Sequence, residues 1–380
     1  GTTRKVLAPF WEDMIAVDSS QITYQVAGNS PNRVLTVEWN LMKAPYNNSV
    51  ANAQFQVKIY ETTNVIEFVY GAGAAPDSAK FITASIGISN SLPILSANQA
   101  TGQFYSVNPA GTAGNRVWHQ TMGGEFNGIG FLPESGTVVR FTPATAPAPL
   151  SGTYTVGGAG ANFATLSDAA MTLNKAGVSG AVTLNVNAGT YDDVFHLIDV
   201  AGTSSSNTIT LKPAGSAGSV ILSPLNGNYS TTAPGSTSGD AMIRLEGTQY
   251  VTVDGLHLIE NTNNMTTRTK FNMGVLMRNS VYPVAGVATF KGARFNTVKN
   301  VLIDLNATAN VANVGAIGIR LGTQGTNTTD TLGANSYNTI QNVIIEDFWR
   351  AAVQMYGFQG ILNPDRGNRI IGVDGYCEFR

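Results

Sequence analysis

The chain has 380 residues, which is long enough for two domains and a large buried core. Charged residues are only 12% of the chain, and the net charge is −2 with no basic cluster, which excludes a nucleic-acid-binding surface. The apolar content of 43% excludes a disordered chain, and no apolar run approaches the ~20 residues that a membrane-spanning helix needs.

Cys377 is the only cysteine, so the sequence allows no internal disulfide and no cysteine-cluster metal site. Residues 1–4 show no charged and then apolar leader, so we expect a secreted protein in its mature form. Residues 374–380 read as the middle of a strand, and we expect the natural chain to continue beyond Arg380.

The first part of the chain is dominated by strict alternation of apolar and polar residues. This pattern is typical of strands with one buried face. No convincing helix interrupts it, so we predict that residues 1–142 form an all-β domain, a jelly-roll-like β-sandwich. The expected strands cover residues 21–26, 34–39, 55–60, 65–70, 84–89 and 138–141.

A Pro/Ala-rich segment at residues 143–150 predicts a stiff, extended linker between two domains. The second domain then covers residues 151–380. Its first part has apolar residues at helical spacing over residues 165–176, with Gly177 placed to end the helix.

After this helix the chain repeats itself. Copies of one short strand pattern begin at Val251, Asn296, Asn338 and Asn368, and second strands of similar form lie at residues 241–245, 274–277, 315–321 and 351–355. Each unit is too small to bury its own apolar side chains, so the units must stack. The sequence therefore predicts a right-handed parallel β-helix, capped at its N-terminal end by the helix and incomplete at its C-terminus.

The second domain also resembles a known family. The segments 154–156, 162–166 and 182–191 resemble the N-terminal cap and first coil of pectin-lyase-like right-handed parallel β-helix proteins. The resemblance covers about residues 151–380 and implies the fold. It does not imply one activity, because this fold carries polysaccharide lyases, pectin esterases and glycosidases as well as proteins that are not enzymes.

The first domain is similar to β-sandwich modules of large secreted surface proteins of the Bacteroidetes type, with a fainter likeness to nidogen-type domains. The residues that carry this similarity are 8–13, 37–39, 55–70 and 136–141. The similarity implies export and a location at the cell surface.

Acidic residues recur at one position of the repeat. Aligning the copies places Asp304 over Glu346, with Asp347 directly after it. A column of carboxylates facing a groove would bind carbohydrate or calcium, whereas a solvated corner of each coil would present the same residues. Trp349 and Tyr356 lie nearby, where aromatic rings would either stack on sugar or a partner protein, or pack beneath a loop.

Two shorter patterns concern modification and stacking. The segments around Ser78 and Thr331 resemble Asp-Ser/Thr-aliphatic sites of O-glycosylation, which would attach glycans to these two side chains. Asn296, Asn338 and Asn368 recur at one position, so we expect their side-chain amides to hydrogen-bond along the stack.

The sequence thus favours a non-catalytic structural or adhesive surface protein, possessing no cofactor, as a segment of a filament, stalk or sheath. Its partners would be other copies of itself, other surface proteins or glycans, with no nucleic acid and no membrane insertion. The alternatives are a carbohydrate-active enzyme (lyase, esterase or glycosidase) and a non-catalytic carbohydrate-binding protein. Bound calcium is compatible with either alternative.

Overall fold

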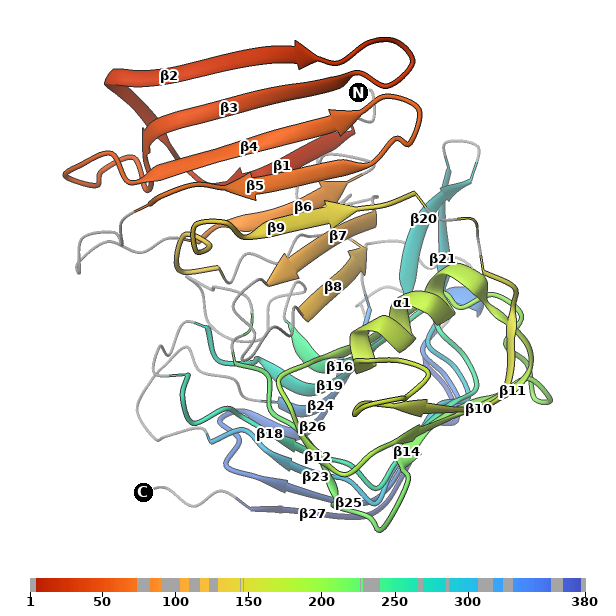
Figure 1. The fold of residues 1–380 in the computed structure, drawn as a ribbon. Helices are drawn as coiled ribbons and strands as arrows, with labels where there is room; N and C mark the ends of the chain where they lie inside the picture. Colours follow the sequence, from red (N-terminus) through yellow and green to blue (C-terminus); the bar gives the residue numbers. More distant parts are fainter. Residues whose placement is uncertain are drawn as a thin grey trace.

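The structure, a computed structural model, describes residues 5–73, 83–89, 103–108, 117–122, 129–143, 145, 147–225, 227, 240–264, 269–284, 287–306, 317–323, 331–356 and 365–376. Nearly all of the regular structure is β, and large parallel sheets dominate its second half (Figure 1). Within the described residues, no helix is long and apolar enough to cross a membrane.

The described residues up to 143 form two antiparallel sheets, which we call the two-sheet unit. One sheet has the order β1-β6-β7-β8 and the other the order β2-β3-β4-β5-β9. The strands are β1 (Val6–Trp11), β2 (Ile15–Ala27), β3 (Val34–Lys43), β4 (Ala53–Tyr60), β5 (Ile66–Tyr70), β6 (Ser85–Ser89), β7 (Gln103–Asn108), β8 (Val117–Met122) and β9 (Val138–Phe141).

Both sheets contribute to one apolar core, because the alternating residues of their strands point between them. Phe55, Phe68 and Ile86 are fully buried there, and the ring of Trp39 stacks on Phe55 at 5.3 Å between centroids. All six strand ranges expected from the alternation form strands. The alternation did not predict β1, β7 and β8.

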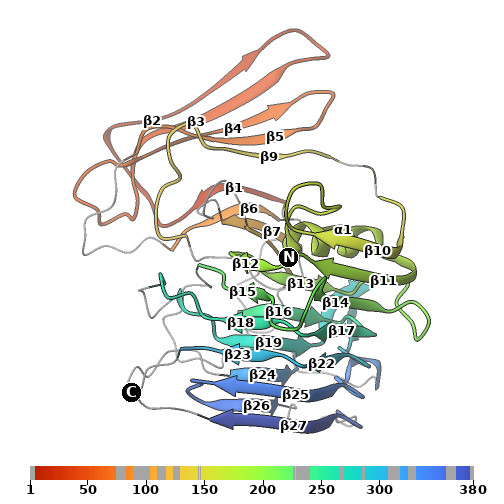
Figure 2. The same cartoon turned by 60° about the horizontal axis from the view of Figure 1, so that its bottom comes forward.

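The chain leaves the two-sheet unit after β9 and enters its next strand, β10 (Leu150–Val156), at the last residue of the expected linker. From β10 onward the strands pair in parallel, apart from the antiparallel hairpin of β20 (Ser280–Val284) and β21 (Val287–Lys291). We call residues 150–376 the coil unit, because successive turns of its chain stack on one another (Figure 2).

Each turn adds strands to two parallel sheets of the coil unit. The larger sheet contains β10, β11 (Val178–Val186), β12 (Gly189–Tyr191), β14 (Ile209–Pro213), β15 (Val220–Leu222), β17 (Val251–Asp254), β18 (His257–Ile259), β22 (Thr297–Lys299), β23 (Leu302–Asp304), β25 (Thr339–Glu346) and β27 (Arg369–Tyr376). The smaller sheet has the order β13 (Phe195–Ile198), β16 (Ala241–Glu246), β19 (Met273–Arg278), β24 (Ile317–Gly322) and β26 (Ala351–Tyr356).

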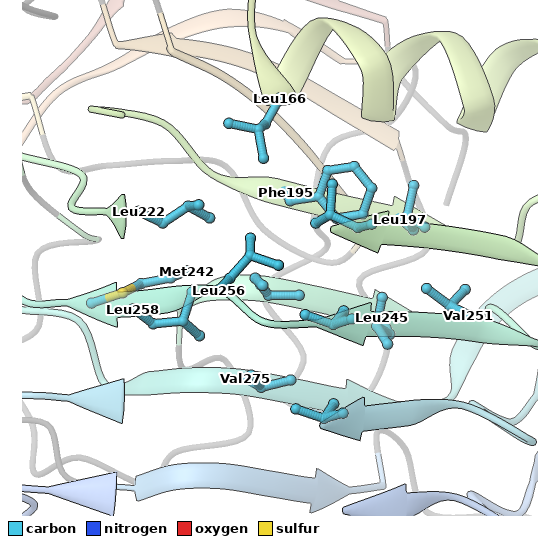
Figure 3. Packing of buried hydrophobic residues seen from close by; sticks show 14 of the residues in the cluster. Leu166, Phe195, Leu197, Leu222, Met242, Leu245, Val251, Leu256, Leu258 and Val275 are labelled. Carbon is cyan, nitrogen blue, oxygen red and sulfur yellow. The ribbon is translucent and has the colours of Figure 1, made fainter. Parts of the chain in front are cut away.

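The expected helix forms as α1 (Leu166–Ala176) and covers one end of this stack (Figures 1 and 3). Thr165 caps its N-terminus, where the side-chain oxygen accepts a hydrogen bond from the backbone N–H of Asp168 at 3.0 Å. Gly177 ends the helix at φ 71°, as the sequence predicted. Leu166 and Leu173 are fully buried against the first coil, so α1 closes the apolar interior at this end.

The repeat predicted from the sequence sets the register of the coils. Thr252, Thr297 and Thr339 are neighbours on adjacent strands, so the copies superimpose as aligned. The asparagine column forms, but mainly through backbone bonds: Asn296 Oδ1 accepts from Val251 N–H at 3.0 Å, and Asn338 Oδ1 accepts from Asn296 N–H at 3.0 Å.

The predicted amide-to-amide bonding is therefore a minor part of this column. One such bond connects Asn338 Nδ2 with Asn368 Oδ1 at 3.1 Å. The amide nitrogens of Asn296 and Asn338 also donate to the carbonyls of Thr248 and Ala293, both at 2.9 Å. Each asparagine thus fastens the turn before a strand to the preceding coil.

Candidate functional site

The predicted carboxylates lie together on the outer face of the larger coil sheet. Asp304 on β23 is the register neighbour of Glu346 on β25, as the alignment predicted. Both alternate with the fully buried Ile303 and Ile345, so their side chains point away from the core. Asp347 follows at φ 46°, a left-handed conformation that turns the chain out of the strand.

These three carboxylates, which we call the carboxylate corner, influence one another electrostatically. The pKa of Asp304 is raised, first by partial burial and then by the negative charges of Asp347 and Glu346. A hydrogen bond from Asn306 N–H to Asp304 at 2.9 Å and the charge of Lys270 act in the opposite direction. The corner therefore concentrates negative charge with one lysine at its margin.

Of the other predicted site residues, the structure describes the side chain of Trp349 only. Trp349 lies two residues after Asp347 and is 42% exposed, so its ring is available to a ligand. Tyr356 ends β26 opposite Gly322, and Thr331 opens a short 3-10 helix (Thr331–Gly333), but the side chains of both lie outside the described part. Ser78 lies outside the described residues altogether.

The described side chains form no metal site of their own. Among them, no three His, Cys, Asp or Glu side chains are grouped so that they could hold a metal ion. The carboxylate corner is thus no side-chain cage for calcium within the described part of the chain.

Glu260, which the sequence reasoning missed, lies just after β18, beside the coil of Asp304. Its carboxylate is buried and accepts hydrogen bonds from Phe271 N–H and Asn264 Nδ2, both at 3.0 Å. Burial raises the pKa of Glu260 to about 8. Because this group is shielded from solvent, it anchors the turn between β18 and β19 and does not extend the carboxylate corner.

A second candidate site lies on the two-sheet unit. Ile22, Tyr24 and Val26 on β2 are the register neighbours of Trp39, Val37 and Leu35 on β3, so they share the face that elsewhere points into the core. That face is not covered at β2, where the exposed fractions of the three side chains are 59%, 78% and 54%. We call Ile22, Tyr24, Val26, Leu35 and Val37 the open inner face.

The strand that carries the open inner face is also an edge strand. Among the described strands, β2 pairs with β3 alone (Figure 1). Over its 13 residues it carries one charge, Asp18, and neither lysine nor proline. Edge strands usually carry such residues as protection against pairing with another chain, and β2 lacks them.

Three aromatic rings stack along a corner of the coil unit. Tyr250, Phe295 and Tyr337 are separated by 4.9 and 5.1 Å between centroids and are nearly parallel, and the Arg294 guanidinium lies 5.3 Å from the ring of Phe295. All three adopt positive φ. Each ring directly precedes one of the repeat copies, so aligning the copies from one residue earlier would have predicted this stack. In the fourth copy the equivalent residue is Gly367.

Comparisons with known proteins give one family match, to the two-sheet unit, and a weak structural similarity. Residues 1–143 match the family model described as NIDO related, which supports the nidogen-type likeness of the two-sheet unit. No curated protein matches the chain. A crystal structure of a GH136 lacto-N-biosidase from Eubacterium ramulus is similar at 14% identity and a TM-score of 0.35, over 52% of this chain and 36% of that one. The chain thus spans about a third of that enzyme's length.

Proposed function

We propose that this protein is an extracellular structural or adhesive surface protein whose two-sheet unit docks onto another protein chain. In this proposal, residues 1–142 are a jelly-roll-like β-sandwich, residues 143–150 a linker, and residues 151–380 a right-handed parallel β-helix. The observation that carries the proposal is the open inner face, where Tyr24 is 78% exposed on an edge strand whose only charged residue is Asp18.

The open inner face offers two kinds of contact at once. Covering its apolar side chains would contribute on the order of 25 cal/mol for each Å² removed from water. The free edge of β2 offers unpaired backbone N–H and C=O groups in the manner of sheets that bind an added strand. Soluble monomeric proteins rarely expose a large contiguous apolar patch, and where one occurs it usually marks an interaction site.

The occupant we propose is a second copy of the chain. Residues 19–27 of β2 carry no charge, so two antiparallel β2 strands would meet without repulsion. A twofold pairing would also place the same apolar face of each copy on one side of a continuous sheet. The coil unit would then act as a rigid spacer, because one apolar cluster runs from α1 to the coil of Ile340 and Val343.

Sedimentation of the protein at increasing concentration tests this proposal. The double substitution Tyr24→Lys with Val26→Lys should abolish self-association and leave the unfolding temperature within a few degrees of the wild type. The matched control, Thr23→Lys with Gln25→Lys, charges the opposite face of the same strand. Wild-type protein that stays monomeric at every concentration, or variants that assemble like the wild type, would refute docking of a second copy.

Carbohydrate binding, with or without turnover, is a second candidate function. The carboxylate corner and the exposed ring of Trp349 favour it, because charged hydrogen-bond acceptors next to an aromatic surface suit sugar rings. Binding to a panel of glycans and polysaccharides should weaken at least tenfold in both Asp304→Asn and Trp349→Ala. Release of sugar products by the wild type and not by the two variants would identify an enzyme. Unchanged binding in both variants would exclude the carboxylate corner as the binding site.

A further inference from the structure

The outer face of the smaller coil sheet carries buried charge. On β16, Arg244 and Glu246 alternate with Ile243 and Leu245, which are part of the coil core, so the two charged side chains point away from that core. Outward side chains of a sheet are usually solvated, yet both of these are buried. The neighbouring strands add Arg278 and Arg320, which are also buried.

Among the described charged groups, Glu246 hydrogen-bonds to one arginine through one of its two oxygens. Its Oε1 accepts a hydrogen bond from Arg278 Nε at 2.9 Å and lies 2.8 Å from Arg278 Nη2. Its Oε2 lies 3.6 Å from Arg244 Nε, which is too long for a hydrogen bond. Glu246 therefore neutralises Arg278 and only partly compensates Arg244.

Among the described residues, Arg244 has one long ion pair and no hydrogen bond. Its side chain is 6% exposed, and its guanidinium makes no hydrogen bond to any residue that the structure describes. Burial and the charge of Arg278 lower the pKa of Arg244 to about 10, although Glu246 and Asp240 act against this shift. A buried guanidinium without hydrogen-bond partners is costly, and an arriving anion would lower that cost.

The nearest polar groups already have other partners. Asp240 Oδ1 accepts from Asn272 N–H at 3.0 Å and from Asn272 Nδ2 at 2.8 Å. His196, the register neighbour of Arg244 on β13, has its Nε2 at 2.8 Å from the carbonyl of Ala241.

We propose that Arg244 is the binding group of an anion site on this face, which takes a small oxyanion such as a carboxylate or a sulfate. A guanidinium presents its N–H groups in a planar fork that fits two oxygens of such a group. Arg278 is neutralised by Glu246, so Arg244 is the cationic group that the anion would meet. The oxyanion comes either from a free inorganic ion or from the acidic group of a sugar.

Thermal unfolding in anion titrations tests the site with Arg244→Met, which replaces the aliphatic part of the side chain and removes its guanidinium. Without added oxyanion, the variant should unfold at the same temperature as the wild type or higher, because an unpaired buried charge has been removed. Sulfate or acetate at constant ionic strength should then raise the unfolding temperature of the wild type by several degrees more than that of the variant.

Arg140→Met, which removes an exposed arginine, is the matched control and should respond to the anions as the wild type does. Equal gains in all three proteins would overturn the proposal, since sulfate stabilises proteins in general. The same loss of stability in Arg244→Met in every salt would show a structural ion pair instead.

A direct measurement does not depend on the variant folding. Wild-type crystals soaked in selenate should show an anomalous peak about 4 Å from a nitrogen of Arg244, because the selenium lies one bond beyond the oxygen that accepts the hydrogen bond. No peak there would overturn the site. Displacement of the selenate by glucuronic acid, and not by acetate, would identify an acidic sugar as the source of the oxyanion, whereas equal displacement by both would identify the free ion.

Discussion

The two units of this protein treat their apolar interiors differently. In the coil unit, α1 covers the end of the stack and buries Leu166 and Leu173 completely. In the two-sheet unit, the inner face continues onto β2, where Tyr24 is 78% exposed. A closed interior supports stability by itself, whereas an open one gains its stabilisation from a partner. The difference points to docking by one unit and support by the other.

The largest effect that separates the two units should be their response to pH. The folded pKa of Glu260 in the coil unit is about 8, above the ordinary 4.5, so its contribution to stability is full below pH 4.5 and is lost as the pH rises to 8. Between pH 5 and pH 8 the free energy of unfolding of the coil unit should fall by on the order of 4 kcal/mol.

Denaturant unfolding across this pH range measures the effect, with Glu260→Gln as the variant that flattens the profile. Glu61 in the two-sheet unit should give no change between pH 5 and pH 8 and a loss of stability only at lower pH, because Arg33 lowers the pKa of Glu61 to about 2. That contribution is present above pH 4.5 and is lost only as the pH falls toward 2. A coil unit that is equally stable at pH 5 and pH 8 would contradict the assignment of Glu260.

The next effect concerns packing. Leu173→Ala should cost about 2–5 kcal/mol of coil-unit stability, because the side chain lies in the closed interior. Val26→Ala, which also shortens an aliphatic side chain, should cost less than about 0.5 kcal/mol in the monomer, because Val26 is exposed. Chemical denaturation of both variants measures the pair, and similar losses would show that the open inner face is covered in solution.

The asparagine column should have an intermediate effect. Asn338→Ala removes buried bonds to Asn296 N–H and to the carbonyl of Ala293, and it should cost about 2 kcal/mol. Thr339→Ala, one residue along on the outer face of the same coil, is the control and should change stability by less than about 0.5 kcal/mol. Equal losses in the two variants would show that the column adds nothing beyond ordinary strand packing.

The smallest effect should come from the helix cap. Thr165→Ala removes the acceptor for Asp168 N–H and should destabilise the coil unit by about 1 kcal/mol, measured by thermal unfolding. Thr23→Ala on the exposed strand β2 provides the comparison and should have almost no effect. A cap variant as stable as the wild type would mean that α1 is held by its packing alone.

Sequence reasoning succeeded where one strand pattern recurs. The repeat fixed the pairing of Thr297 with Thr339 and of Asp304 with Glu346, because parallel stacking requires equivalent residues to be neighbours. It also located α1 from the spacing of apolar residues and from Gly177.

What the sequence could not show is which faces are covered. Ile22, Tyr24 and Val26 alternate with polar residues just as buried strand residues do, since alternation identifies a face and not its neighbour. Arg244 looks like an ordinary outward residue, and its burial depends on groups that are distant in sequence. The strand β8 was missed because Val117–Met122 mixes polar and apolar residues without a regular period.

The corner between the two strand halves of each coil has a further consequence. Gly255, Asn300, Asn342 and Gly372 hold this corner with φ of 74°, 54°, 51° and 57°, so four coils turn in the same way despite their different sequences. A whole coil is therefore an interchangeable increment of length. Duplication or loss of one coil in the gene would lengthen or shorten the molecule by about 4.8 Å and leave its ends unchanged. The length of the stack can therefore change during evolution in steps of one coil.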